Sequence, residues 1–107
     1  MSEINFDERL QELFDNFKQQ LPTRLDTILT AWKGYLETGQ QVDLEELRFH
    51  IHKLAGAAST YGFTEIGENA RTVETRLDQF LKDGSREEVE AELTPSIRYI
   101  QDLIENC

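Results

Sequence analysis

The sequence predicts an all-α protein, an up-down antiparallel four-helix bundle with an additional N-terminal helix across one end. Apolar residues recur at three- and four-residue spacing along almost the whole chain, which is the pattern of helices with one buried face. No stretch alternates apolar and polar residues with the period of two that a half-buried strand shows. Only two Pro and six Gly occur in the 107 residues, and this scarcity favours long helices. The length suits one domain, which we expect to span residues 1–107.

The first helix is expected at about residues 6–20. Asn5 and Glu8 have the spacing of a capping box, which satisfies free backbone N–H groups at a helix start. Pro22 lacks a backbone N–H, so it belongs in the first turn of a second helix or at a kink. Gly39 is placed to end that second helix in a left-handed conformation. The apolar stripe of the first helix consists of Phe6, Leu10, Leu13, Phe14, Phe17 and Leu21.

The remaining three helices carry their own start and stop signals. Asp43 begins the third predicted helix, which stops near Gly62. Thr64 can cap the fourth helix, and Ser85 opens the fifth in a capping-box pattern. Pro95 falls inside the apolar stripe of the fifth helix and should bend or interrupt it. The connections are only a few residues long, so consecutive helices should pack as antiparallel neighbours.

Charge and composition exclude several classes of partner. Acidic residues number 21 and basic residues 11, and the resulting formal charge of −10 repels phosphate backbones and anionic lipid head groups. Neither nucleic acid nor a membrane surface is therefore an expected partner. No apolar run approaches the roughly 20 residues of a membrane span, and the start lacks a signal-peptide pattern. Cys107 is the only cysteine, which excludes an internal disulfide. We expect a cytoplasmic monomer.

Both histidines of the chain, His50 and His52, lie in the third predicted helix. They point about 160° apart around the helix axis, so they cannot chelate one metal ion, and we expect no metal site. His52 lies outside the apolar stripe and should be at least partly exposed. His50 lies at the edge of the stripe, where a boundary histidine with one hydrogen bond is expected.

Two further residues of this helix need an explanation. Glycine inside a helix costs roughly 1 kcal/mol relative to alanine. Gly56 follows His52 by one turn, so it either lets a partner approach the imidazole or permits close packing against another helix. Phe49 points nearly opposite the predicted core. Either the N-terminal helix covers it, or it belongs to a docking surface with His52.

The run His-Lys-Leu-Ala-Gly-Ala-Ala-Ser-Thr-Tyr-Gly-Phe, from His52 to Phe63, resembles the His-x-Leu-Lys-Gly signature of histidine-containing phosphotransfer (HPt) domains. It is also similar to the first domain of chemotaxis histidine kinases. The resemblance implies that His52 carries a phosphoryl group between receiver-domain aspartates in a two-component phosphorelay. One aspartate would belong to a hybrid or sensor histidine kinase and the other to a response regulator. The resemblance implies no ATP site and no catalysis by the chain itself.

One departure from the family pattern concerns charge near the phosphosite. Ala55 occupies the position of the family lysine, so Arg48 or Lys53 is the candidate for a cation on the phosphate side. The chain shows no acidic cluster that must bind Mg²⁺ and no glycine-rich phosphate loop, so we expect no resident cofactor and a Mg²⁺ ion supplied by the receiver domain. Partner access and docking are assigned to Gly56, Phe49 and Ser59.

Three alternatives stay open at this point. A helical adaptor could bind a signalling partner through the face of Phe49 and His52 without being phosphorylated, and Ala55 is its best support. An excised first domain of a larger chemotaxis kinase would share the chemistry in a different arrangement. An enzyme in its own right is disfavoured because the sequence shows no second nucleophile–base pair, metal cluster or nucleotide loop.

Overall fold

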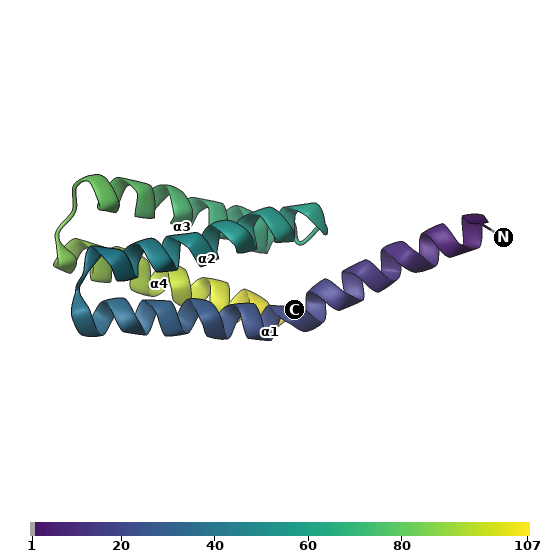
Figure 1. Ribbon diagram of the computed structural model, residues 1–107, viewed down its shortest axis with the longest axis horizontal. Coiled ribbons are helices and arrows are strands. Elements are labelled where there is room, and N and C mark those ends of the chain that lie inside the picture. Colours follow the sequence, from purple (N-terminus) through teal and green to yellow (C-terminus); the bar gives the residue numbers. More distant parts are fainter. Residues whose placement is uncertain (1) are drawn as a thin grey trace.

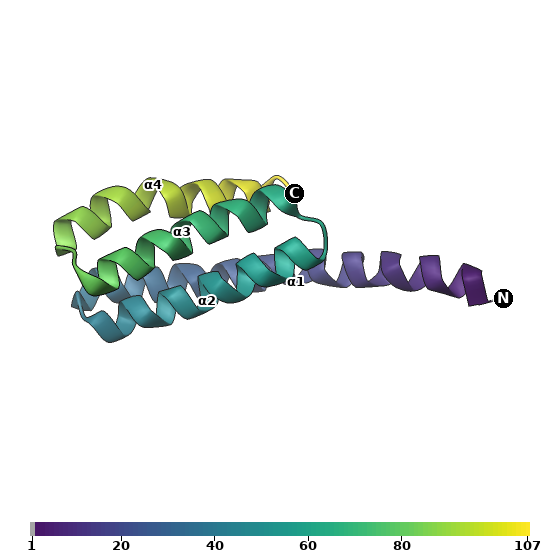
Figure 2. The same cartoon turned by 90° about the horizontal axis from the view of Figure 1, so that it is seen from above.

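The structure, a computed structural model, describes the backbone of residues 2–107 and the side chains of residues 6–107. Within that part it is all-α, with four helices and no strand: α1 (Ser2–Thr38), α2 (Gln41–Thr60), α3 (Thr64–Lys82) and α4 (Arg86–Glu105). Each short connection reverses the direction of the chain, and the helices lie side by side as a bundle (Figures 1 and 2). Helix α1 packs against α2 and α4, and α3 packs against the same two.

Helix α1 replaces the two helices that the sequence predicts before Gly39. It runs without a break through Pro22, so the expected start of a second helix there is wrong. Figure 1 shows α1 bending between the bundle and its N-terminal part, as the alternative of a kink predicts. The backbone is already helical at Asn5, and the side chain on which the expected capping box depends lies outside the described side chains.

Pro22 removes the hydrogen bond to the carbonyl of Lys18, and its ring pushes that carbonyl aside. Both residues are exposed, so water can solvate that carbonyl. Breaking the helix would instead disturb Leu21 and Leu25, which are buried on either side.

The N-terminal part of α1 projects beyond the bundle rather than crossing its end (Figures 1 and 2). A helix of 37 residues is about 55 Å long at 1.5 Å per residue, and the molecule measures 57 × 21 × 21 Å. The bundle starts at Phe14 and Phe17. The Phe14 ring lies 6.5 Å from that of Tyr61 and 6.3 Å from that of Phe63, and the Phe17 ring lies 5.1 Å and 5.2 Å from the same two rings. We call residues 2–13 the overhang. The prediction of a separate helix across one end is therefore wrong.

The turns confirm two of the helix ends and one of the helix starts that the sequence predicts. Gly39 and Gly62 have φ angles of 65° and 82°, in the left-handed region that favours glycine. Ser85 caps α4, its Oγ accepting a hydrogen bond of 3.2 Å from the backbone N–H of Glu88. Pro95 lies inside α4 without interrupting it.

Two predicted helix starts are displaced by one or two residues. Helix α2 already begins at Gln41, and Asp43 in its first turn accepts a hydrogen bond from the Thr38 hydroxyl at the end of α1. Thr64 is the first residue of α3 rather than its cap, a position taken by Phe63. The acidic side chain of Asp43 therefore ties two helices together instead of capping one.

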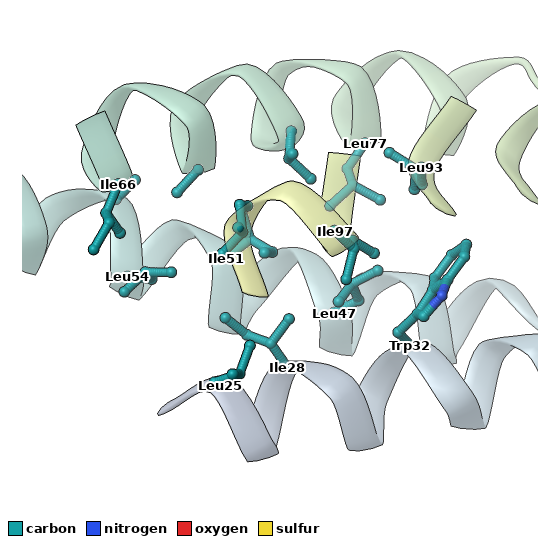
Figure 3. Packing of buried hydrophobic residues seen from close by; sticks show 14 of the residues in the cluster. Leu25, Ile28, Trp32, Leu47, Ile51, Leu54, Ile66, Leu77, Leu93 and Ile97 are labelled. Carbon is teal, nitrogen blue, oxygen red and sulfur yellow. The ribbon is translucent and has the colours of Figure 1, made fainter. Parts of the chain in front are cut away.

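All four helices contribute to one apolar core, and no described polar side chain is buried in it (Figure 3). From α2, the core takes Leu44, Leu47, Ile51, Leu54, Ala55 and Ala58. These residues fix the rotation of α2 about its own axis and so decide which of its side chains face outward. No described helix is long and apolar enough to cross a membrane.

Candidate functional site

The imidazole of His52 projects from α2 into solvent. Its neighbours Ile51 and Leu54 are fully buried, so the core holds the backbone while His52 points away from it. The His52 side chain is 62% exposed, which confirms the predicted exposure. A rigid bundle helix therefore presents this ring to any molecule that approaches α2 and α3.

A carboxylate on α3 determines which nitrogen of His52 is free. His52 Nδ1 lies 2.6 Å from Oε2 of Glu74, whose side chain is only 15% exposed. Because a carboxylate only accepts hydrogen bonds, Nδ1 is the nitrogen that carries the proton in this contact. The neutral ring then has its lone pair on Nε2. Nucleophilic chemistry at this histidine is therefore directed to Nε2.

Arg48 shares the same carboxylate from one turn earlier on α2. Its Nη2 lies 3.4 Å from Oε2 of Glu74, and its Nε donates a hydrogen bond to Asp78. That hydrogen bond to Asp78 raises the pKa of Arg48 above its usual value. The structure thus places a permanent cation next to the carboxylate that holds His52, and two acidic side chains of α3 fix its position.

Lys53, the other cation candidate, lies on a different side of α2. Its Nζ sits 5.1 Å from the centre of the Phe49 ring, in the geometry of a cation–π contact. Phe49 is 52% exposed, so α1 does not cover it. Of the two expectations for Phe49, a place on a docking surface with His52 remains. The structure therefore brings Arg48, and not Lys53, to the Glu74–His52 pair.

Gly56 borders open space. A Cβ added there would meet no atom within 4 Å beyond its own helix, so the close-packing explanation is wrong and partner access remains. The close approach of α2 and α3 occurs at Gly67 instead, where an added Cβ would lie 2.7 Å from Ser59 Oγ and 3.2 Å from Ser59 N. Ser59 is exposed but lies against this glycine, at the edge of the surface assigned to docking.

Exchanging Gly56 for alanine should raise the free energy of unfolding by roughly 0.5–1 kcal/mol, because the helix gains propensity and the methyl group meets nothing. Thermal or urea unfolding measures the change. Gly67→Ala is the matched control and should lower stability, since its methyl group meets the backbone of Ser59. A destabilised Gly56→Ala protein would contradict the open-space description. Gly56→Leu should also fold, yet obstruct a docking partner.

His50 is a boundary histidine with one hydrogen bond, as the sequence predicts. Its Nε2 lies 2.9 Å from Oε1 of Glu46, one turn earlier on the same helix, and its side chain is 20% exposed. Ala55, at the position of the family lysine, is 2% exposed. A long side chain at position 55 would have to leave the interface between α2 and α3.

Sequence reasoning missed the two carboxylates of α3 that organise the site. Glu74 and Asp78 are one turn apart beside the buried stripe of α3, and both meet Arg48. Two acidic residues at this spacing could have indicated a binding site for a cation. Only the packing of α2 against α3 shows that the cation is Arg48. Among the described residues, no group of three or more His, Cys, Asp or Glu side chains could hold a metal ion.

Comparison with known proteins gives one family. A family model described as Hpt domain matches residues 12–107, which is most of the chain. No curated protein and no solved structure matches the sequence significantly. The matched range includes all of the site residues described above and omits most of the overhang.

Proposed function

Because the chain belongs to the Hpt domain family, we propose that it relays a phosphoryl group between receiver-domain aspartates, with His52 as the phosphoacceptor. Hpt domains are phosphocarrier modules of phosphorelays rather than enzymes. The observation that carries the assignment is the exposed imidazole of His52, whose Nδ1 is held by Glu74. The partners in this proposal are a hybrid or sensor histidine kinase and a response regulator in the cytoplasm. Residues 1–107 act as one domain.

The transfer step follows from the orientation of the ring. Nε2 of His52 attacks the phosphorus of an aspartyl phosphate, the N–P bond forms, and the P–O bond to the aspartate breaks, so the aspartate leaves as a carboxylate. The proton stays on Nδ1 throughout. The ring therefore becomes positively charged as the bond forms, and the Glu74 carboxylate, 2.6 Å away, stabilises that charge. Transfer to the second receiver domain reverses these steps.

The remaining requirements of phosphoryl transfer are divided between the two proteins. Phosphoryl transfer needs positioning, a metal ion and cations near the equatorial oxygens. The guanidinium of Arg48 is the cation that this chain offers next to the His52 site. We assign the Mg²⁺ ion to the receiver domain. Gly56 leaves room for its backbone, and Phe49 and Ser59 belong to the surface on which it docks.

A second candidate, a helical adaptor that is never phosphorylated, rests on the exposed ring of Phe49 and on Ala55 in place of the family lysine. It would use the same face of the bundle. The two functions differ in one observable, the appearance of a phosphoryl group on the chain, and they are separated by the same experiment.

The test uses a panel of receiver domains, each phosphorylated by a small phosphodonor in the presence of Mg²⁺, mixed with the purified chain. We expect acid-labile phosphate to move to the wild-type chain and to the His50→Gln variant, and not to the His52→Gln variant. His50→Gln is the matched control because it removes the other histidine of the same helix. Transfer from no receiver to a folded wild-type chain would favour the adaptor. Transfer to His52→Gln would place the phosphosite elsewhere.

A further inference from the structure

Arg48 is held by two carboxylates of α3, and one of them, Asp78, has no part in the transfer step. The Nε of Arg48 donates a hydrogen bond to Oδ1 of Asp78, and its Nη2 lies 3.4 Å from Oε2 of Glu74. The same Oε2 of Glu74 is the partner of His52. One guanidinium is therefore shared between a carboxylate that serves the imidazole and a carboxylate that does not.

We propose that Asp78 competes with the phosphoryl group for Arg48. Asp78 holds the guanidinium while His52 is unphosphorylated and loses it when the phosphoryl group is on Nε2. This inference rests on the proposed function of His52. Arg48 and His52 are four residues apart on α2, so their side chains are neighbours on one face of the helix. Asp78 thereby sets how strongly the chain retains the phosphoryl group.

The ion pair of Arg48 and Asp78 is one that a phosphoryl group can break. The two side chains are 36% and 46% exposed, and ion pairs between exposed side chains contribute little to stability. A phosphoryl group carries a charge between about −1.5 and −2 and offers three acceptor oxygens. Arginine binds such a group through two parallel hydrogen bonds. The phosphoryl group is therefore a stronger partner for Arg48 than a single exposed carboxylate.

The arrangement of charges decides which carboxylate gives up Arg48. Glu74 stays with the ring, because the phosphorylated imidazole of His52 is cationic and its Nδ1 lies 2.6 Å from Oε2 of Glu74. Among the described side chains, Asp78 pairs with Arg48 alone, and its exposure lets water solvate it once Arg48 leaves. Lys53 contacts the ring of Phe49 instead. Arg48 is therefore the cation that moves, and Asp78 is the carboxylate that it leaves.

NMR of the ¹⁵N-labelled Nε–H group of Arg48 tests the exchange of partners, in a His50→Gln chain before and after phosphorylation by phosphoramidate. Phosphoramidate gives its phosphoryl group to the imidazole, and ammonia leaves. Before phosphorylation, the Arg48 signal should differ between this chain and its Asp78→Asn variant, because only the first has the hydrogen bond to Asp78. After phosphorylation the two signals should nearly coincide, since the phosphoryl group then holds Arg48 in both. The signal of Arg76, which pairs with Glu92 of α4, should not move.

The effect on retention is measured as the equilibrium between a phosphorylated receiver domain of the panel and the chain. Asp78→Asn should shift this equilibrium about two- to five-fold toward phosphohistidine, which corresponds to the loss of one exposed ion pair. Glu92→Gln is the matched control, because Glu92 is 42% exposed and also pairs with an arginine of α3. It should leave the equilibrium unchanged. In an Arg48→Gln background, Asp78→Asn should lose its effect.

These measurements separate the competition from the proposed function. If phosphorylation left the difference between the two Arg48 signals unchanged, Asp78 would still hold Arg48 and the competition would be overturned. An equilibrium that Asp78→Asn leaves unchanged, or shifts toward aspartyl phosphate, would overturn it equally, and the second result would mean that Asp78 positions Arg48 for transfer. Transfer from no receiver domain would overturn the proposed function instead, while the Arg48 signals of the chemically phosphorylated chain would still decide whether Arg48 changes partners.

Discussion

Replacing Glu74 by alanine should slow acceptance of a phosphoryl group by His52 about 10- to 100-fold. The variant loses the hydrogen bond that keeps the proton on Nδ1 and the charge that stabilises the phosphorylated ring. A hydrogen bond to a charged group contributes roughly 1.5–3 kcal/mol, and each 1.36 kcal/mol corresponds to a factor of ten in rate. Single-turnover transfer from a phosphorylated receiver domain measures the effect.

The control is Glu46→Ala, which removes the carboxylate next to His50 and should leave the transfer rate unchanged. Nitrogen-15 NMR of the imidazole reports the tautomer of His52, which would not change if Glu74 only stabilised the fold. Wild type should show the Nδ1–H tautomer of His52, and Glu74→Ala should show a mixture. If transfer were equally fast in both variants, Glu74 would have no part in positioning the ring.

Replacing Ile51 by alanine should lower the free energy of unfolding by about 2–5 kcal/mol. Ile51 is fully buried on the core side of α2, and removing three carbon atoms there leaves a cavity that the surrounding helices cannot fill completely. A domain of this size has a total stability of about 5–15 kcal/mol, so the loss is a large part of it. Urea unfolding monitored by circular dichroism gives the number.

Ile51→Val is the graded control and should cost about 0.5–1.5 kcal/mol. Because Ile51 precedes His52, the pair of variants also separates stability from chemistry. Ile51→Val should transfer phosphoryl groups like wild type at temperatures where it is folded. A loss below 1 kcal/mol for Ile51→Ala would mean that this part of α2 is not packed as described.

The helices of the bundle could be predicted from apolar periodicity, because burial on one face imposes it directly. Where the prediction failed, at Pro22, the periodicity itself was continuous: Phe17, Leu21, Leu25 and Ile28 keep three- and four-residue spacing across the proline. A single lost hydrogen bond at an exposed position costs less than the core contacts on either side. The helix therefore continues, because burial of the apolar stripe outweighs the cost of Pro22.

Only part of the candidate site could be predicted from the sequence. His52 and Gly56 could be found because both lie on one helix, where angular position follows from residue number. Glu74 and Asp78 could not, because their meeting with Arg48 depends on how α3 is rotated and shifted against α2. That register is set partly by Gly67, at which the two helices approach closely.

NMR of the ¹⁵N-labelled chain after transfer from a phosphorylated receiver domain shows which atom accepts the phosphoryl group. We expect one phosphoryl group, coupled to Nε2 of His52, with Nδ1 still protonated and His50 unchanged. A phosphoryl group on Nδ1 of His52, on His50 or on no histidine would contradict this expectation.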